Sequence, residues 1–552
     1  MTAVLRCFIG VRQCTCIHQK VSEKAVSVVR VIAAVVRVAE SSSFTQTYAK
    51  KDVLVLIFSV FVAGLCSIIY ELLIATTSSY FLGDSITQFS LTIGIYMAAM
   101  GVGSYCSRLI DEQHLLARFI FAEIVLALLG GASVPLLYVM FSYSDNYQLY
   151  SMLLTFAIGC LIGLEIPLLS RLMSVHFPLK KNISNIMSID YLGALIATLL
   201  FPFVLLPFMG VFRSSVFFGL MNLSIAVVTL WCFAANIGMR RARILRFYWV
   251  FSGVLLLVLF IFSGTFIERW SSQLYSDRIV YQQQTPYQNI VLTKYKKDMR
   301  LFLNGNLQFS AIDEYRYHEA LVHVPMHYAS QQGKVLLLGA GDGLATRELL
   351  KYKDLSSITI VDLDPAITTL ATTNANLIAL NQSSLTDPRV NIIHQDAFKY
   401  LNANNDFYDF IIVDLPDPKT TALARFYSKE FYKLVKLRLS QNGVFVTQAT
   451  SPVYAKKAFW SIRESIAAAG YAQVLPYHVN VPSFGEWGFV IGTKMAQQAR
   501  ALPAIDTRFI SEDSWQHYYH FDKDLLVANI KVSWLDQPEV MSYYLKGWQY
   551  WH

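Results

Sequence analysis

The chain has 552 residues, of which 54% are hydrophobic and 15% are charged, and its mean hydropathy is +0.41. This composition is too apolar for an ordinary soluble protein and too charged for a protein that lies wholly within a membrane. The formal net charge of +8 does not indicate nucleic-acid binding. The lysine and arginine residues lie mainly at the ends of apolar runs. The second half of the sequence has no basic run with interleaved aromatic residues.

The first half of the chain holds apolar runs of the length that spans a bilayer as a helix, about 20 residues. We expect a membrane domain over residues 51–267, with transmembrane helices at 53–75, 86–106, 115–140, 151–174, 186–209, 214–236 and 247–267. The chain is therefore expected to be a multi-pass protein of the cell (inner) membrane, in contact with the lipid bilayer.

Residues 1–50 are predicted to form a basic amino-terminal tail. The segment "AVSVVRVIAAVVRVAE" is too short and too interrupted by arginine to span a membrane, and no signal-peptide pattern with a cleavage site is present. We expect a cytoplasmic tail, or an amphipathic helix that lies in the membrane interface.

The basic residues between the predicted helices are concentrated in alternate loops. One set of loops carries Lys50, Lys51, Arg108, Arg118, Arg171, Lys180, Lys181, Arg240, Arg241, Arg243 and Arg246, and the other set carries almost no base. The positive-inside rule therefore places the amino terminus in the cytoplasm, and an odd number of helices then places the second half of the chain outside. Because this conflicts with any cytosolic cosubstrate, either one helix is miscounted or the second half faces outward.

From residue 268 onward the pattern is that of a water-soluble protein. Residues 268–330 predict a small β module, with an Asn-Gly hairpin turn at Asn304–Gly305. Residues 331–500 alternate short apolar strands with amphipathic helices, which predicts a doubly wound, Rossmann-like α/β domain with a parallel sheet. We expect strands at 334–339, 357–364, 390–396, 410–415 and 443–449, and an aromatic-rich packing extension at 501–552.

Polar residues follow each predicted parallel strand, at the edge where such sheets bind ligands. The first strand leads into "GAGDG", which contains Gly339, Gly341 and Asp342. The later strand ends carry Asp362, then Asp396 beside Ala397, then Asp414 with Asp417, and finally Gln448. Each acid taken alone is explained by a helix N-cap or a turn. Acids at successive strand ends together indicate a nucleoside-type ligand.

The charge of this edge indicates which nucleoside-type ligand fits. Asp342, Asp414 and Asp417 would repel phosphates, and no Gly-Lys-Ser/Thr motif follows the glycine turn. A cationic nucleoside such as an S-adenosyl sulfonium fits better.

With these residues the sequence resembles the polyamine aminopropyltransferases, the spermidine synthase family. The resemblance covers residues 277–495 and the arrangement, with membrane helices in front, is similar to the membrane-fused bacterial branch. Its motifs, in family order, are "YQNIVL", "DEYRYHEALVHVP", "GAGDG", "IVDLDP", "HQDAF", "VDLPDP" and "PSFGEWGF". The fold it implies is the Rossmann-like fold of S-adenosylmethionine-dependent methyltransferases.

The resemblance implies transfer of an aminopropyl group from the cosubstrate decarboxylated S-adenosylmethionine to putrescine or a related amine, giving spermidine and methylthioadenosine. It implies Asp414 as proton acceptor. Contacts to the donor are implied for Gln288, Asp362, Asp396, Ala397, Gly339 and Gly341, and contacts to the amine for Tyr317, His318, Asp342 and Asp417. No permanently bound cofactor and no metal are expected, and the resembling enzymes are commonly homo-oligomers.

Some positions depart from the family pattern. Ala340 replaces a glycine, Asp362 stands where Glu is common, and "DLPDP" carries Leu415 and Pro416 in place of small residues. Phe484 lies near a position where a tyrosine often touches the amine. These departures leave the acceptor amine open.

Two other functions stay open from the sequence. A methyltransferase on the same sheet is one, although methyl transfer needs no acid cluster for a diamine. A polyamine transporter or sensor with a degenerate synthase domain is the other, because the predicted helices contain Glu71, Glu123, Glu165 and Asp190. Acids within lipid are costly and usually face a polar cavity or a partner.

Overall fold

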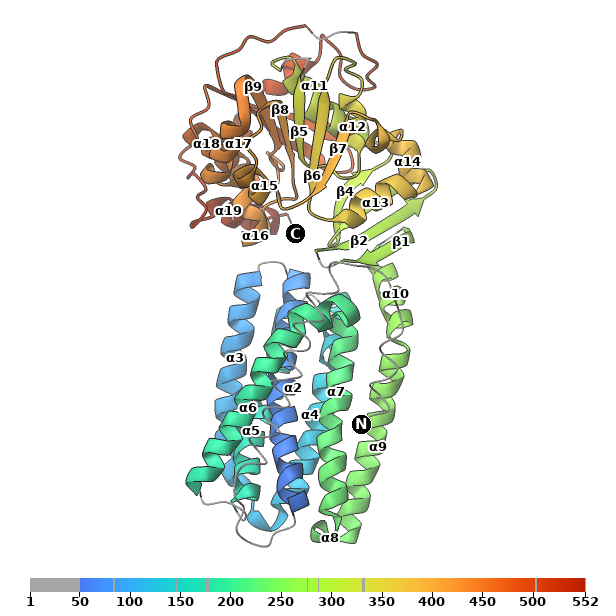
Figure 1. Cartoon of the computed structure of the whole chain (residues 1–552), viewed down its shortest axis with the longest axis vertical. Helices are drawn as coiled ribbons and strands as arrows, with labels where there is room; N and C mark the ends of the chain where they lie inside the picture. The colour runs from blue at the N-terminus through green and yellow to red at the C-terminus, as the bar shows by residue number, and fades with distance from the viewer. Residues whose placement is uncertain are drawn as a thin grey trace. The chain divides into compact units, whose positions relative to one another are not determined.

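The computed structural model describes residues 50–82, 85–144, 146–174, 179–275, 277–285, 287–329, 333–501 and 504–551. The basic tail predicted for residues 1–50 lies, apart from Lys50, outside the described residues. The chain forms a helical half followed by a half built from two β-sheets with helices (Figure 1).

The helical half is a bundle of long apolar helices that run back and forth (Figure 1). The helices are α2 (Lys50–Leu82), α3 (Ser85–Cys106), α4 (Leu115–Tyr143), α5 (Tyr147–Met173), α6 (Leu179–Leu200), α7 (Leu206–Cys232), α8 (Ala234–Ile237), α9 (Met239–Ile261) and α10 (Ser263–Leu274). The short helices η1 (Ser107–Leu109) and η2 (Glu112–His114) connect α3 to α4. Among the described residues, 6 helical stretches are long and apolar enough to cross a membrane.

One of these stretches, Lys180–Cys232, contains the fifth predicted helix and most of the sixth. The π-helical segment η3 (Phe201–Leu205) follows α6, and Gly210 breaks the helical geometry near the start of α7 with φ 68° and ψ 175°. This positive φ favours glycine, which has no Cβ to clash. α6 and α7 run in opposite directions (Figure 1), so each of the predicted helices has a counterpart. The last one starts at Met239 rather than at residue 247, because its run of arginines is also helical.

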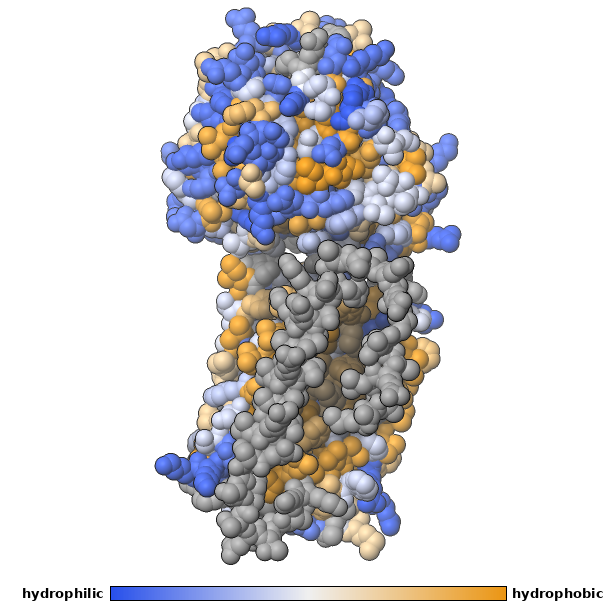
Figure 2. All heavy atoms as spheres, viewed as in Figure 1, coloured by the Kyte–Doolittle hydropathy of each residue, from blue (hydrophilic) through white to orange (hydrophobic). Residues whose placement is uncertain are grey.

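Close helix contacts and an apolar surface characterise the bundle. A Cβ on Gly103 would lie 2.0 Å from the carbonyl oxygen of Cys160, so only glycine lets α3 approach α5 this closely. Large apolar side chains also point outward, and Figure 2 shows hydrophobic atoms along the visible flanks of this half. Those more than half exposed include Met97, Leu153, Phe208, Trp231 and Phe247. A bundle that is apolar both inside and outside is typical of a membrane domain.

The small β module is a four-stranded antiparallel meander in the order β1-β2-β3-β4. Its strands are β1 (Arg278–Gln284), β2 (Asn289–Tyr295), β3 (Asp298–Leu303) and β4 (Asn306–Ser310). The predicted hairpin turn is present, with φ 51° at Asn304 and φ 78° at Gly305.

The second sheet has seven strands in the order β10-β11-β9-β8-β5-β6-β7. They are β5 (Lys334–Gly339), β6 (Ser357–Asp362), β7 (Val390–His394), β8 (Tyr408–Asp414), β9 (Leu439–Gln448), β10 (Gln473–Val481) and β11 (Gly485–Thr493). β5 to β9 are parallel and correspond to the five predicted strands, whereas the antiparallel hairpin β10–β11 is an addition to the prediction.

Helices cover both faces of this sheet (Figure 1). The helices are α11 (Glu314–Met326), α12 (Leu344–Leu349), α13 (Pro365–Thr373), α14 (Ala375–Asn381), α15 (Ala397–Ala403), α16 (Thr421–Ala424), α17 (Lys429–Arg438), α18 (Lys456–Ala468) and α19 (Glu539–Gln549), with the short η4 (Ser384–Thr386), η5 (Arg425–Tyr427), η6 (Trp515–Tyr519) and η7 (Lys523–Leu525).

Alternate residues of the central strands feed two separate cores. Leu337 of β5 packs on one face, and Leu336 and Leu338 pack on the other. Successive strand residues point to opposite faces, so a strand covered on both sides must be apolar throughout. This is why the strands appear in the sequence as continuous apolar runs.

The positive-inside rule predicts where the carboxyl terminus lies. The basic loops lie at one end of the bundle, and α9 leaves the bundle at the other end (Figure 1). We therefore expect a tag at the carboxyl terminus to react with a membrane-impermeant reagent in intact cells or spheroplasts. Labelling only after permeabilisation would show that the bundle is inserted against the rule, with the second half in the cytoplasm.

Candidate active site

Four carboxylates meet at the carboxyl edge of the parallel sheet. Asp362 ends β6, Asp414 ends β8, and Asp342 lies in the glycine turn that follows β5, the strand between them. Asp417 follows β8 by three positions. We call these four residues the acidic edge. Each of them is partly exposed, so a ligand can reach it.

The glycine turn brings β5 against the other two strands. Gly339 has φ 85°, and a Cβ on it would lie 2.0 Å from the carbonyl oxygen of Asp414. A Cβ on Gly341 would lie 2.5 Å from Oδ2 of Asp362, and the Gly341 amide donates a hydrogen bond of 3.1 Å to the same oxygen. Ala340, where the resembling enzymes carry glycine, also has a positive φ of 57°. This backbone conformation costs a non-glycine residue about 1 kcal/mol.

Asp414 lies among groups of both charges. The Tyr317 hydroxyl donates a hydrogen bond of 2.6 Å to its Oδ1. Burial raises the pKa of Asp414 to about 6, because desolvation penalises the charged form. His318 and the Tyr317 hydrogen bond oppose this rise, and Asp342 and Asp362 add to it. The carboxyl is therefore suited to exchange a proton near neutral pH.

His318 is held by an ion pair behind the acidic edge. Its Nδ1 lies 2.9 Å from Oε2 of Glu314, and Arg347 binds both oxygens of the same carboxylate at 2.8 and 3.0 Å. Burial alone lowers the pKa of His318, but the bond to Glu314 and the nearby Asp342 and Asp414 outweigh it and raise this pKa. His318 is thus favoured as a cation next to the acidic edge.

Asp342 and Asp362 are held by backbone amides. The Leu344 amide donates to Asp342 at 2.9 Å, and the Asp364 amide donates to Asp362 at 2.9 Å. Burial raises the pKa of Asp342, although His318 opposes the rise. Burial, together with Asp342, raises the pKa of Asp362 to about 6. Both carboxylates are oriented by amide hydrogen bonds, and neither forms a salt bridge with a basic side chain of the described residues.

Gln288 reaches this edge from the β module. Its Nε2 donates to Oδ2 of Asp364 at 3.0 Å, and the Thr285 hydroxyl donates to the same oxygen at 2.7 Å. Asp364 follows Asp362 by two residues, so this contact places Gln288 beside the end of β6.

Asp396 and Ala397 begin α15, as the N-cap interpretation predicts. Oδ1 of Asp396 accepts a bond of 3.0 Å from the Lys399 amide, and Oδ2 forms an ion pair with Arg425. The side chain is thus engaged within the protein, and Ala397 is buried next to it.

Asp417 is bound by side chains from two distant parts of the chain. Nε2 of Gln448, the last residue of β9, donates to Oδ1 at 3.2 Å, and the Tyr544 hydroxyl donates to Oδ2 at 3.0 Å. Burial raises the pKa of Asp417, while Lys419 opposes the rise. This surrounds one carboxylate with two neutral donors and a nearby cation.

Tyr544 is a site residue that the sequence analysis misses. It lies on α19, in the extension interpreted as packing, and it is also buried against α18 and the sheet. No spacing in the sequence connects it to a residue 127 positions earlier. The aromatic run "YYLKGWQYW" is the one trace of it, and that run is explained as well by packing. Lys419 is missed for a similar reason, since a lysine in a loop usually faces solvent.

Within the ranges that the structure describes, no group of three or more His, Cys, Asp or Glu side chains is arranged to hold a metal ion. The described cysteines Cys66, Cys106, Cys160 and Cys232 are free thiols of the helical half.

The ion pair behind the site yields a stability prediction. In Glu314→Gln the buried His318 loses its countercharge and Arg347 keeps only its pair with Glu348, and we expect the free energy of unfolding to fall by about 3–5 kcal/mol. Chemical denaturation of the purified full chain in detergent measures this. As a control, Glu464→Gln removes a surface pair with Arg463, and we expect a loss of about 1 kcal/mol or less. Equal effects of the two substitutions would contradict a supporting role for Glu314.

Comparisons with known proteins agree with this geometry. Residues 314–501 match the family model described as the spermine/spermidine synthase domain. The chain is 39% identical over 496 residues to a polyamine aminopropyltransferase of Leptospira interrogans, an alignment that covers 89% of this chain and 98% of the relative. It is 40% identical over 502 residues to polyamine aminopropyltransferase 2 of Ralstonia nicotianae, with 89% and 98% covered.

A solved structure, spermidine synthase from Thermotoga maritima, aligns with 45% of this chain and 86% of its own chain, at 20% identity and a TM-score of 0.39. The matches to the Leptospira and Ralstonia proteins are longer than the second half of this chain, so they include the helical half as well. The chain belongs to the polyamine aminopropyltransferase family and is a transferase of the spermidine synthase type.

Proposed function

We propose that this enzyme transfers the aminopropyl group of decarboxylated S-adenosylmethionine to putrescine or a related amine, giving spermidine or the corresponding polyamine and methylthioadenosine. The observation that carries this proposal is the acidic edge, where four partly exposed carboxylates gather and outnumber the nearby cations His318 and Lys419. Such a surface favours cationic ligands and disfavours phosphates.

The donor is bound, in this proposal, at the ends of β5, β6 and β7. Gly339 and Gly341 let the backbone approach the nucleoside, and Asp362 accepts the ribose hydroxyls. Gln288 contacts the donor from the β module. Because the Asp396 side chain is engaged with Lys399 and Arg425, the adenine edge is bound by the backbone at Asp396 and Ala397.

The amine is bound at the end of β8. Asp417, with Gln448 and Tyr544 around it, holds the ammonium group that does not react. Asp342 receives an ammonium group as well, and Tyr317 and His318 line the path to Asp414. The carboxylate oxygens of Asp417, Asp342 and Asp414 accept the N–H bonds of a protonated diamine.

Asp414 is the proton acceptor of this proposal. A protonated amine has no free electron pair, so its proton must leave for the nitrogen to attack. The nitrogen–carbon bond forms as the carbon–sulfur bond breaks, the sulfur leaves as a neutral thioether, and the amine proton passes to Asp414. Tyr317 orients the accepting oxygen through its 2.6 Å bond to Oδ1.

We also propose that the helical half lies in the cell membrane. Its outward apolar side chains and its small-residue helix contacts support this, together with the length of its helices. The bilayer would then cover a surface that water disfavours.

A methyltransferase activity remains the second candidate, because the same type of sheet serves methyl transfer. The group of Asp417, Gln448 and Tyr544 favours aminopropyl transfer, since methyl transfer needs no second ammonium site. Release of methylthioadenosine distinguishes the two reactions.

Substitution of the proton acceptor tests the proposed chemistry. We expect Asp414→Asn to lower the turnover of putrescine by about 10²–10⁴-fold, the usual contribution of a general base. The measurement is methylthioadenosine release from decarboxylated S-adenosylmethionine. Asp406→Asn, in the exposed loop before the same strand, serves as the matched control and should keep wild-type turnover. Intact turnover in Asp414→Asn would overturn the assignment.

The raised pKa of Asp414 predicts a pH dependence. The carboxyl accepts a proton only when ionised, so kcat/KM should rise with pH through about 6 and fall as the pH drops below that value. Asp362 has a similar pKa. In the residual activity of Asp414→Asn, the fall of kcat/KM at low pH should therefore lose the part that Asp414 contributes. If the fall at low pH is unchanged in this variant, it belongs to another group.

The contact from α19 predicts an effect on amine binding. In Tyr544→Phe, the carboxylate of Asp417 loses the hydrogen bond that the Tyr544 hydroxyl donates to it. Because this is a hydrogen bond to a charged group, we expect KM for the diamine to change by about tenfold while kcat changes little. Steady-state kinetics with saturating donor measures this. Tyr543→Phe, at the neighbouring helix position, is the matched control. An effect confined to kcat would contradict a role in binding the distal ammonium.

A further inference from the structure

A second acidic group lies inside the helical half, far along the sequence from the acidic edge. Glu123 of α4 is 0% exposed and Glu165 of α5 is 3% exposed. Their side chains are within hydrogen-bonding reach of each other. Asn222 of α7, also 0% exposed, donates its Nδ2 to Oε2 of Glu123 at 3.1 Å and to the Glu123 carbonyl at 3.2 Å.

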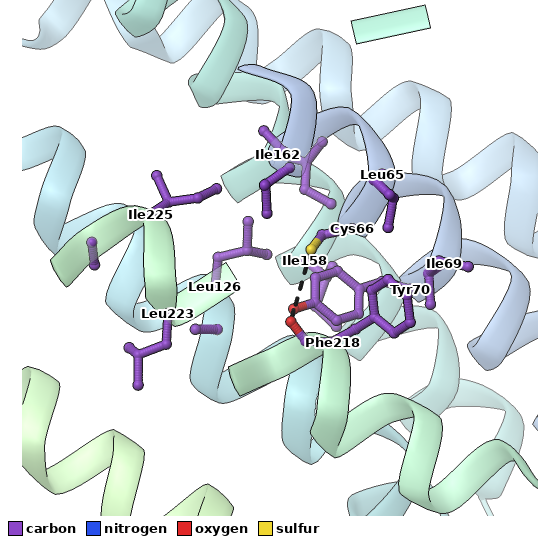
Figure 3. Packing of buried hydrophobic residues seen from close by; sticks show 14 of the residues in the cluster. Leu65, Cys66, Ile69, Tyr70, Leu126, Ile158, Ile162, Phe218, Leu223 and Ile225 are labelled. Carbon is purple, nitrogen blue, oxygen red and sulfur yellow. Dashed lines mark hydrogen bonds between the residues drawn. The ribbon is translucent and has the colours of Figure 1, made fainter. Parts of the chain in front are cut away.

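The surroundings of this group are apolar. Leu126, one helical turn after Glu123, and Ile162, one turn before Glu165, are buried in the core of the bundle with Leu223, the neighbour of Asn222. Figure 3 shows these side chains gathered with Cys66 and Tyr70, whose polar atoms both donate to the Phe218 carbonyl. Two ionised carboxylates in such a place would repel each other strongly.

The polar atoms of the group are short of donors. Apart from the contact between the two carboxyls, Oε1 of Glu123, Oε1 of Glu165 and Oδ1 of Asn222 have no hydrogen-bond partner among the described residues. All three atoms are acceptors, from three different helices. A hydrogen bond between two carboxyls requires a proton on one of them. A buried acceptor without a protein donor is satisfied by a proton, a cation or an ordered water, and two adjacent carboxyls favour a proton or a cation because these reduce the repulsion between them.

The titratable groups facing the pair offer no positive charge. Within the described helices these groups are Cys66, Tyr70, Tyr96 and Asp190. Tyr96 also faces Glu71 and the partly exposed Asp190 on α6. Asp190 packs against the α2 backbone, since a Cβ on Gly64 would lie 2.6 Å from its Oδ1. Two further acids, Glu71 and Asp190, therefore lie near the groups that surround the pair.

We propose that Glu123, Glu165 and Asn222 form a cation-exchange site in the helical bundle. The unloaded site holds one proton between the two carboxyls, and the proton leaves for solvent when an ammonium group of a polyamine takes its place. One positive charge replaces another, so the net charge of the site, −1 on the two carboxyls together with the bound cation, is the same before and after the exchange.

The choice of an ammonium group rests on the proposed function. Two carboxyls and an amide oxygen are hydrogen-bond acceptors, and an ammonium supplies the donors that they lack. The amine site proposed for the second half of the chain also combines a carboxylate with an amide, those of Asp417 and Gln448. Acids within a predicted membrane domain are costly, and they mark ion paths and proton relays.

The test uses the full chain in lipid vesicles that contain a pH-sensitive dye. We expect a spermidine gradient to drive proton movement in the opposite direction, and Glu123→Gln and Glu165→Gln each to slow this movement by about tenfold or more. Glu112→Gln, at an exposed acid of the short helix η2 before α4, is the matched control and should behave as wild type. Absence of coupled proton movement in the wild-type chain would overturn the proposal, as would unchanged movement in both variants.

Two further measurements separate the alternatives. Asp414→Asn should keep the exchange, so failure of the proposed enzyme chemistry and failure of this site are distinguishable. Retained methylthioadenosine release by Glu165→Gln shows that this variant is folded. If it is not folded, a hydrophobic carbodiimide probes the wild-type chain instead, because it reacts with protonated buried carboxyls. Labelling of Glu123 or Glu165 that spermidine suppresses supports the site, and absent or spermidine-insensitive labelling contradicts it.

Discussion

In the proposed reaction, the repulsion between two positively charged reactants is the constraint on which the rest of this structure depends. At an effective dielectric constant of about 20, two unit charges separated by 4 Å repel by about 4 kcal/mol. A surface that brings a sulfonium and an ammonium together must supply negative charge at the point of contact. The acidic edge has that charge, and its carboxylates in turn repel one another. Backbone amides, Tyr317 and the cationic His318 keep them in place.

The fold provides this support from behind the site. The register of β5 on β8 places Gly339 opposite Asp414, and only glycine fits that distance. The buried Arg347 and Glu314 fix His318 on α11. Glu319, on the same helix, accepts amide bonds from Arg508, Phe509 and Ile510, and so ties the carboxyl-terminal segment to the catalytic domain. From there the chain continues to α19, which carries Tyr544.

Local patterns in the sequence predict the part of this site that depends on neighbouring residues. Continuous apolar strands with acids at their ends predict both the parallel sheet and the position of Asp362 and Asp414, because strand direction and side-chain alternation are local properties. The hairpin β10–β11 and Tyr544 depend on long-range contacts that no spacing records. For the Asp396 carboxylate, the sequence predicts the position but not the partner. Its position at a strand end is predicted, but its pair with Arg425 comes from the tertiary fold.

In the helical half, Glu123 and Glu165 also bring carboxylates close together, here in apolar surroundings instead of at the acidic edge.

The most direct test of the account is a structure of this enzyme with a donor analogue and a diamine bound. We predict the reacting nitrogen at the carboxylate of Asp414 and the far ammonium at Asp417, within reach of Tyr544. A diamine bound without contact to either carboxylate would contradict the central claim that these acids hold the two cations together.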